Sequence, residues 1–181
     1  VVGDVILDKV SDTYVHSTSN RLVSVIGLSN LIVVDTQDAV LVTNKEHAQD
    51  VKNIVEKIKK SGRLESDQHR KIFRPWGYYD SIDRGEGFQV KRILVNPGQK
   101  LSLQKHNHRS EHWVVVKGKA QVTCGEKTFQ LIENQSTYVS LGKVHRLENI
   151  EDTSLEIIEI QTGSYLGEDD IIRIDDDYER A

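Results

Sequence analysis

Short apolar runs separated by polar residues occupy the N-terminal part of the chain. The runs cover residues 22–26, 31–34 and 39–42. β-Branched residues dominate them, and their starts lie about nine residues apart, which is typical of short strands joined by tight turns. We therefore expect stacked strands here, as in a few coils of a β-solenoid. Because such a strip cannot close a core of its own, we expect it to pack against the rest of the chain or another domain.

Residues 45–60 change to the period of an α-helix. Lysine and glutamate side chains take one face of this helix, and the other face carries Ala48, Val51, Ile54, Val55 and Ile58. Thr43 and Glu46 have the spacing of a capping box. Gly62 is placed to end the helix, because glycine readily adopts the left-handed conformation found there.

The polar stretch 61–72 has no period and predicts a linker between two domains, residues 1–60 and 73–181. In the second domain, short apolar runs follow one another closely. Predicted strands cover residues 88–95, 101–105, 112–116, 120–124, 128–132, 136–140 and 155–161. Gly118 and Gly125 end two of them. Many short strands with glycine turns indicate a mainly β fold, an antiparallel sandwich or barrel.

Composition narrows the functional classes. The chain carries 24 basic and 28 acidic residues, a net charge of −4, which gives no sign of a nucleic-acid partner. Cys124 is the only cysteine, so no internal disulfide can form. No apolar run approaches the roughly 20 residues needed to cross a bilayer, and no secretory signal is visible, so we expect no membrane partner and a cytoplasmic location. Methionine is absent, so we expect a piece of a longer protein.

A group of metal-ligating residue types lies where one predicted strand turns into the next. Gln104 and His106 are two residues apart and share one face of a strand. Glu111 opens the returning strand with His112 on its opposite face, and His145 begins another strand. Imidazole, carboxylate and amide donors suit Zn²⁺, Mn²⁺, Fe²⁺ or Co²⁺. The alternative is that the histidines only decorate a surface turn.

The same spacings resemble those of the cupin family. The matching positions are Gly98, Gln104, His106, Glu111 and Gly118 in the first cupin motif and Gly142, His145 and Asn149 in the second. Asn134 and Ser140 stand at turn positions where the family has glycine and proline. The resemblance implies a double-stranded β-helix, or jelly-roll, barrel with one divalent metal ion on Gln104, His106, Glu111 and His145. Gln104 in place of a histidine resembles the zinc set of phosphomannose isomerases, which favours Zn²⁺ and leaves Mn²⁺, Co²⁺ and Fe²⁺ open.

Longer segments narrow the resemblance. The matching segments are Arg74-Pro75-Trp76-Gly77, Phe88-Gln89-Val90-Lys91, Leu101-Ser102-Leu103-Gln104, His106–Trp113 and Tyr165–Asp170. From Phe73 to Arg180 the chain resembles the C-terminal domain of type II phosphomannose isomerases, bifunctional enzymes with mannose-1-phosphate guanylyltransferase activity. Residues 1–60 resemble the end of the guanylyltransferase half, which implies a short left-handed β-helix-like strand strip. The glycine-rich nucleotide-binding start of that half is absent, so guanylyl transfer is not expected of this chain.

The resemblance implies an enzyme that interconverts mannose-6-phosphate and fructose-6-phosphate in GDP-mannose and polysaccharide biosynthesis. Arg109 occupies the position where distantly related zinc isomerases place a catalytic basic residue, so it is the first candidate for steering the enediolate or the proton transfer. His108 is a weaker candidate for acid–base catalysis, and its alternative is an exposed place on the turn. Glu159 and Gln161 share strand parity and are reserve candidates for the base.

Phosphate recognition needs fixed positive charge. Lys91 and Arg92 are neighbours on one strand, so only one of them can face the interior. The resemblance in this strand favours Lys91. Arg173 is a second option, although the acidic composition after Gly167 predicts a solvated, partly ordered terminus.

Two other functions remain open. One is a cupin that binds metal or sugar phosphate without turnover, because one fold supports many functions. The other is an oligomerisation module of a mannose-1-phosphate guanylyltransferase. Open strand edges tend to pair with a second copy, so we expect a homodimer.

Overall fold

The computed structural model describes residues 1–19, 21–63 and 69–179. The chain forms two compact units, Val1–Arg70, which we call the N-terminal unit, and Lys71–Ala181, which we call the barrel unit. Part of the predicted linker, residues 64–68, lies outside the described residues. Its last two residues are not linker, because they begin the first strand of the barrel unit. Among the residues described, no helix is long and apolar enough to cross a membrane.

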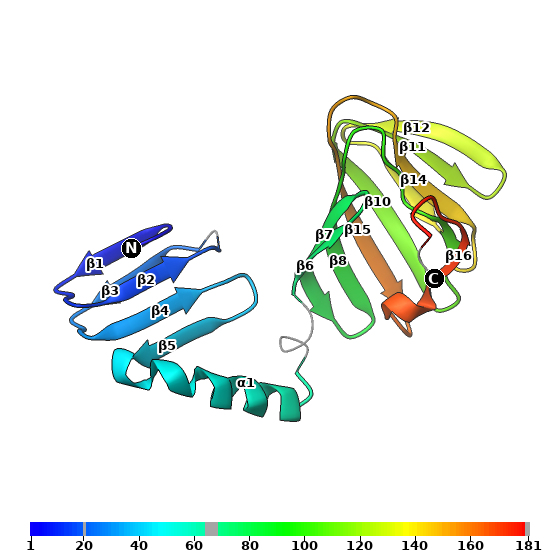
Figure 1. Ribbon diagram of the computed structural model, residues 1–181. Helices are drawn as coiled ribbons and strands as arrows, with labels where there is room; N and C mark the ends of the chain where they lie inside the picture. The colour runs from blue at the N-terminus through cyan, green and yellow to red at the C-terminus, as the bar shows by residue number, and fades with distance from the viewer. Residues whose placement is uncertain (20, 64–68, 180–181) are drawn as a thin grey trace. The chain divides into compact units, whose positions relative to one another are not determined.

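The N-terminal unit is built from the predicted short strands (Figure 1). Strand β1 (Val5–Asp8) pairs in parallel with β3 (Val23–Ile26), and β2 (Tyr14–Ser17) pairs in parallel with β4 (Leu31–Asp35). Strand β5 (Val40–Asn44) closes this group antiparallel to β4. Parallel pairing of every second strand is the arrangement of a β-solenoid, as the strand spacing predicted. Among its described residues, the unit buries a small apolar cluster centred on Val15, Val25 and Val33.

The helix predicted over residues 45–60 is shorter than expected. Residues Lys45–Asp50 form a 3₁₀ helix, and only α1, Val51–Lys60, is α-helical. No residue of α1 is buried, and Ile54 and Val55 are 46% and 41% exposed. The amphipathic pattern therefore predicted the helix, but its apolar face contributes nothing to the core of the described structure.

The ends of this helical segment follow local turn chemistry. The side chain of Asn44, and not that of Thr43, accepts a hydrogen bond from the backbone N–H of Glu46. The predicted capping box is therefore wrong, because an asparagine oxygen satisfies this N–H within two residues. Gly62 has φ of +67° and donates its N–H to the carbonyl of Lys59, so it ends the helix as predicted.

The barrel unit contains two sheets in which every strand pair is antiparallel. The six-stranded sheet has the order β13 (Ser136–Val139), β10 (Arg109–Lys117), β15 (Leu155–Gly163), β8 (Phe88–Val95), β7 (Gly77–Gly85) and β6 (Lys71–Arg74). The five-stranded sheet has the order β12 (Lys127–Ile132), β11 (Lys119–Cys124), β14 (His145–Asn149), β9 (Leu103–Lys105) and β16 (Ile172–Asp175). Figure 1 shows both sheets in green to red.

Alternation along the strands decides what faces the core. On β10, Glu111, Trp113 and Val115 are buried, whereas His112 between them is exposed. The core that results is apolar and includes both tryptophans of the chain, Trp76 and Trp113. Because Glu111 belongs to the same buried row of β10, the interior of the barrel unit contains polar side chains beside this apolar core.

The C-terminal tail differs from the expected solvated terminus. Strand β16 pairs with β9, and the segment between β15 and β16 contains a 3₁₀ turn, η3, formed by Glu168–Asp170. Asp170 is buried, although it belongs to the acidic segment that was expected to be solvated. The tail is thus part of the fold, and it brings residues from far along the sequence to the site described next.

Candidate metal centre and its cavity

Three of the predicted ligands meet inside the barrel unit. One ligand atom each from His106, Glu111 and His145 lies within 4.8 Å of the others. His106 follows β9 directly, Glu111 lies on β10 and His145 begins β14. All three are at most 2% exposed. The group therefore joins residues from both sheets in a water-poor interior.

The imidazole of His145 is oriented for ligation by a backbone hydrogen bond. Nδ1 of His145 donates to the backbone carbonyl of Lys143 at 2.8 Å, which leaves the lone pair on Nε2. Nε2 of His106 lies 3.0 Å from Glu111 Oε1, and Nε2 of His145 lies 3.5 Å from Glu111 Oε2. Within the described part of the chain, neither Nε2 has a hydrogen-bond partner of acceptable geometry. Buried nitrogens without partners are costly, so these residues fit a divalent cation held between them and the carboxylate.

Gln104 lies beside this group. It is directly opposite His145 in the pairing of β9 with β14, and with Glu111 it lines a cavity beside the group. Its Oε1 accepts a hydrogen bond from Ser102 Oγ at 2.8 Å. An amide oxygen has two lone pairs, so this bond leaves one for a further interaction.

A hydrogen-bonded network fixes the Glu111 carboxylate. Trp113 Nε1 donates to Glu111 Oε2 and to Glu159 Oε1, both at 3.1 Å. Gln161 Nε2 donates to Glu111 Oε1 at 3.1 Å and to Glu159 Oε2 at 2.9 Å. Arg109 Nε approaches Glu111 Oε1 at 3.4 Å. Trp113 and Gln161 therefore each donate to both carboxylates and hold them close together.

The two carboxylates differ in pKa. Burial acts to raise the pKa of Glu111, but the adjacent imidazoles of His106 and His145 hold it well below its usual value. Burial and the adjacent Glu111 carboxylate raise the pKa of Glu159 to about 8. The site thus contains one carboxylate suited to bind a cation and one suited to hold a proton.

Replacing Trp113 by phenylalanine is expected to weaken metal binding by about 10–100-fold, because the Glu111 carboxylate loses a donor that fixes its orientation. A competition titration against a chromophoric chelator measures this dissociation constant. Trp76→Phe is the matched control, since Trp76 is equally a core residue of this unit. Equal affinity of the two variants for metal would show that the indole N–H does not support the ligand.

A cavity of about 470 Å³, which includes space open to solvent, adjoins the group. Its charged lining among the described residues consists of the basic Arg74, Lys91, Arg109 and Arg173 and the acidic Glu111, Glu159 and Glu168. The basic residues outnumber the acidic ones, which suits an anionic ligand.

The structure distinguishes between the basic candidates on β8. Lys91 is 4% exposed and lines the cavity, with its Nζ 2.6 Å from Glu168 Oε1. Arg92 points to the other face and pairs with Glu156 at 2.7 Å. Arg173 on β16 also lines the cavity, opposite Gln104 in the strand register.

The two neighbouring basic candidates on the turn behave differently. Arg109 is 2% exposed, lines the cavity and donates from Nη1 to the Gly167 carbonyl at 2.7 Å. The His108 side chain is 55% exposed, bonds to Asp170 through Nδ1 at 2.8 Å and does not line the cavity. We do not propose His108 for acid–base catalysis, because its side chain is half-exposed, bonds to Asp170 and is not among the residues that line the cavity.

Arg74, Tyr79 and Glu168 line the cavity with charged or aromatic side chains but received no role from the sequence. Arg74 and Glu168 lie in segments that carried the family resemblance, and this was the available signal. Nothing in the local pattern around Tyr79 distinguishes it from a core aromatic residue.

Comparison with known families divides the chain in two. Residues 61–176 match the family described as mannose-6-phosphate isomerase C-terminal. Residues 4–58 match the family described as MannoseP isomerase/GMP-like beta-helix domain.

Curated relatives match almost the whole chain. Xanthan biosynthesis protein XanB of Xanthomonas campestris pv. campestris is 56% identical over 179 residues, 99% of this chain and 38% of that protein. Alginate biosynthesis protein AlgA of Pseudomonas aeruginosa is 54% identical, and mannose-1-phosphate guanylyltransferase ManC of Salmonella typhimurium is 52% identical, each covering 99% of this chain and 37% of its own length. The chain therefore spans less than two fifths of these relatives.

Solved structures support the fold. A mutant of Bacillus subtilis oxalate decarboxylase OxdC matches 60% of this chain and 31% of its own, with a TM-score of 0.53 and 18% identity. KdgF from Halomonas sp. matches 56% of this chain and 90% of its own, with a TM-score of 0.51 and 13% identity. At these identities the likeness shows the fold alone. That fold is the cupin barrel that the motif spacing predicted.

Proposed function

The chain belongs to the mannose-6-phosphate isomerase C-terminal family, and from that premise we propose that its barrel unit interconverts mannose-6-phosphate and fructose-6-phosphate with the help of a divalent metal. The observation that carries the proposal is the convergence of His106, Glu111 and His145 beside a cavity whose described lining includes four basic side chains, Arg74, Lys91, Arg109 and Arg173. A metal and an anion can then bind next to each other. A phosphorylated sugar with reactive oxygens at its other end matches both.

We also propose that the chain is the C-terminal isomerase part of a longer, bifunctional enzyme of GDP-mannose and polysaccharide biosynthesis. Two findings support this proposal. The chain covers 38% or less of the length of these relatives, and one of them is a mannose-1-phosphate guanylyltransferase. Guanylyl transfer is not proposed for these 181 residues, since they lack a glycine-rich nucleotide-binding stretch followed by lysine.

The proposed metal ligands are Gln104, His106, Glu111 and His145. Their nitrogen and oxygen donors suit Zn²⁺ first, and Mn²⁺, Co²⁺ or Fe²⁺ as well. When bound there, the metal supplies an electrophile for the hydroxyl and carbonyl oxygens of the sugar.

The reaction moves a proton between C2 and C1 through an enediolate, so it needs a proton carrier and stabilised negative charge. Arg109 provides the charge, because its buried guanidinium lines the cavity next to Glu111. Glu159 is the proposed proton carrier. Its carboxyl group lines the cavity and is fixed by Trp113 and Gln161, so it can hold a proton at a defined place.

Phosphate recognition is proposed for Lys91 and Arg173. Both line the cavity, and they come from strands of different sheets. Each adds a fixed positive charge to the cavity, and a phosphate bound to Lys91 stays in the same cavity as Arg109 and Glu111.

An enzyme-coupled assay that follows fructose-6-phosphate formation tests the proposal. We expect turnover by the metal-loaded chain, at a rate within about 1–10³ s⁻¹ that is usual for enzymes. Chelation should abolish it, and added divalent metal should restore it. Metal-loaded protein that binds mannose-6-phosphate without turnover above the blank would refute the isomerase and identify a binding module instead.

A further inference from the structure

Glu168 places a carboxylate among the basic residues of the cavity. It belongs to η3, the turn drawn in orange after β15 (Figure 1). Its Oε1 lies 2.6 Å from Lys91 Nζ, and its Oε2 lies 3.9 Å from Arg74 Nη2. Seventy-seven residues separate Lys91 from Glu168 in the sequence, so the fold of the tail creates this contact.

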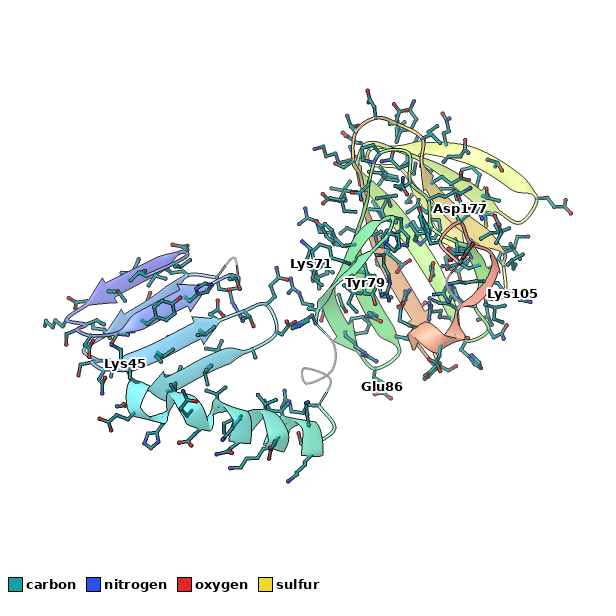
Figure 2. The ribbon with its side chains drawn as sticks, in the orientation of Figure 1. Lys45, Lys71, Tyr79, Glu86, Lys105 and Asp177 are labelled. Atoms are coloured by element: carbon teal, nitrogen blue, oxygen red, sulfur yellow. The ribbon has the colours of Figure 1, made fainter. Side chains whose placement is uncertain are left out.

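One aromatic ring holds the two cations near each other. Lys91 Nζ lies 4.6 Å from the centroid of the Tyr79 ring, and Arg74 Cζ lies 5.6 Å from it. Figure 2 labels Tyr79, which comes from β7. The Lys91 side chain is only 5% exposed, and a buried cation needs an anion beside it. The place next to Lys91 and Arg74 is therefore built for a negative group.

The turn that carries Glu168 is held by its other residues. Asp170 accepts hydrogen bonds from the backbone N–H groups of Asn107 and His108 at 3.2 Å each, and it also bonds to the His108 ring. On the other side, the Gly167 carbonyl accepts from Arg109. The Glu168 side chain itself is 40% exposed, whereas that of Asp170 is 3% exposed. Glu168 can thus release Lys91 while the turn stays attached.

We propose that Arg74 and Lys91 form the subsite for the phosphate of the substrate and that Glu168 is its built-in occupant, which a competing anion displaces. A phosphate dianion offers more charge and more acceptor oxygens than one carboxylate, so it outcompetes Glu168 for both cations. A neutral sugar has no anionic group that can displace Glu168 from Lys91 and Arg74. Glu168 is then a specificity-determining residue, because it excludes ligands that lack phosphate. The inference rests on the proposed function, since it assigns the phosphate of that substrate.

Phosphate binding to the metal-loaded, full 181-residue chain tests this directly. Isothermal titration calorimetry with inorganic phosphate as the probe should show binding at least roughly tenfold tighter in Glu168→Gln than in the wild type, because the competing charge has gone. Asp169→Asn is the matched control. It removes one negative charge from the same turn, but Asp169 is exposed and bonds to Tyr165 instead of the cavity cations. Adding Arg74→Gln to Glu168→Gln should reverse the gain.

Two results would overturn the inference. One is a phosphate affinity of Glu168→Gln within twofold of that of Asp169→Asn, when unfolding followed by tryptophan fluorescence shows that both variants are folded. The other is a collapse of kcat in Glu168→Gln with unchanged phosphate affinity, which would make Glu168 a catalytic residue.

The binding measurement separates this inference from the proposed function because it needs no turnover. Tighter phosphate binding by Glu168→Gln in a protein without isomerase activity would support the subsite and refute the function. An active wild type with no gain of phosphate affinity in Glu168→Gln would support the proposed function and refute the subsite.

Discussion

Replacing His106 by alanine is expected to abolish stoichiometric metal binding. His106 is buried, and its Nε2 faces the Glu111 carboxylate without a hydrogen-bond partner among the described residues. Residues that merely support a ligand cost about 10–100-fold in metal affinity when they are lost. Loss of a ligand should exceed that range, so metal measured by elemental analysis after gel filtration should fall far below one ion per chain.

His112→Ala is the matched control for this experiment. His112 lies on the same strand as Glu111 but faces outward, where its ring contacts Tyr138. Its replacement should leave metal content unchanged. Equal losses in both variants would mean that the assignment of the inward face to the metal is wrong. Metal added to the wild type should also raise its thermal stability, because a ligand that binds only the folded state stabilises it, and His106→Ala should lose this shift.

Replacing Arg109 by alanine is expected to lower kcat of the isomerase by about 10²–10³-fold, the usual effect of losing one donor to a developing oxyanion. Arg109 is the basic side chain of the cavity that lies against the proposed metal ligand Glu111. Arg109→Lys should recover only part of the activity, since lysine keeps the charge but loses the planar arrangement of donors. Steady-state kinetics of the metal-loaded variants measure both effects.

Arg92→Ala controls for the loss of a positive charge on the same sheet, because Arg92 is half-exposed and faces away from the cavity. Its kcat should stay close to that of the wild type. A kcat of Arg109→Ala within about threefold of the wild type would exclude Arg109 from the chemistry. Metal content has to be measured in parallel, since a loss of metal would show that Arg109 acts by holding Glu111 and not on the substrate.

The strand containing Lys91 shows where periodicity stops being informative. Positions 88–95 alternate between two faces that both carry apolar residues, such as Val90 on one and Ile93 on the other. Alternation therefore predicts that Lys91 and Arg92 point oppositely, but it does not say which points inward. That depends on which face the second sheet covers, and this is a property of the assembled barrel.

Two strands and the tail show a related limit. Strands β6 and β7 were not predicted, because their exposed, charged positions, such as Asp83 and Arg84, hide the apolar ones. The tail is acidic and was expected to be solvated. Instead β16 pairs with β9, and Glu168 reaches a cation 77 residues away in sequence. Composition reflects average exposure and cannot reveal a single long-range ion pair.

The sequence by itself determined the local features of this protein. It predicted the solenoid strands, the helix end at Gly62, the barrel and the ligand set Gln104, His106, Glu111 and His145, of which the last three meet in the structure. The strands and the helix end follow from side-chain and backbone geometry over a few residues. The cupin barrel and the four-residue ligand set rest on the family resemblance of the motifs. The tertiary structure alone decided that Lys91 faces the cavity, that His108 does not, and that Glu168 lies among the cations. Such contacts depend on which faces become buried when distant segments pack, and no local pattern records that choice.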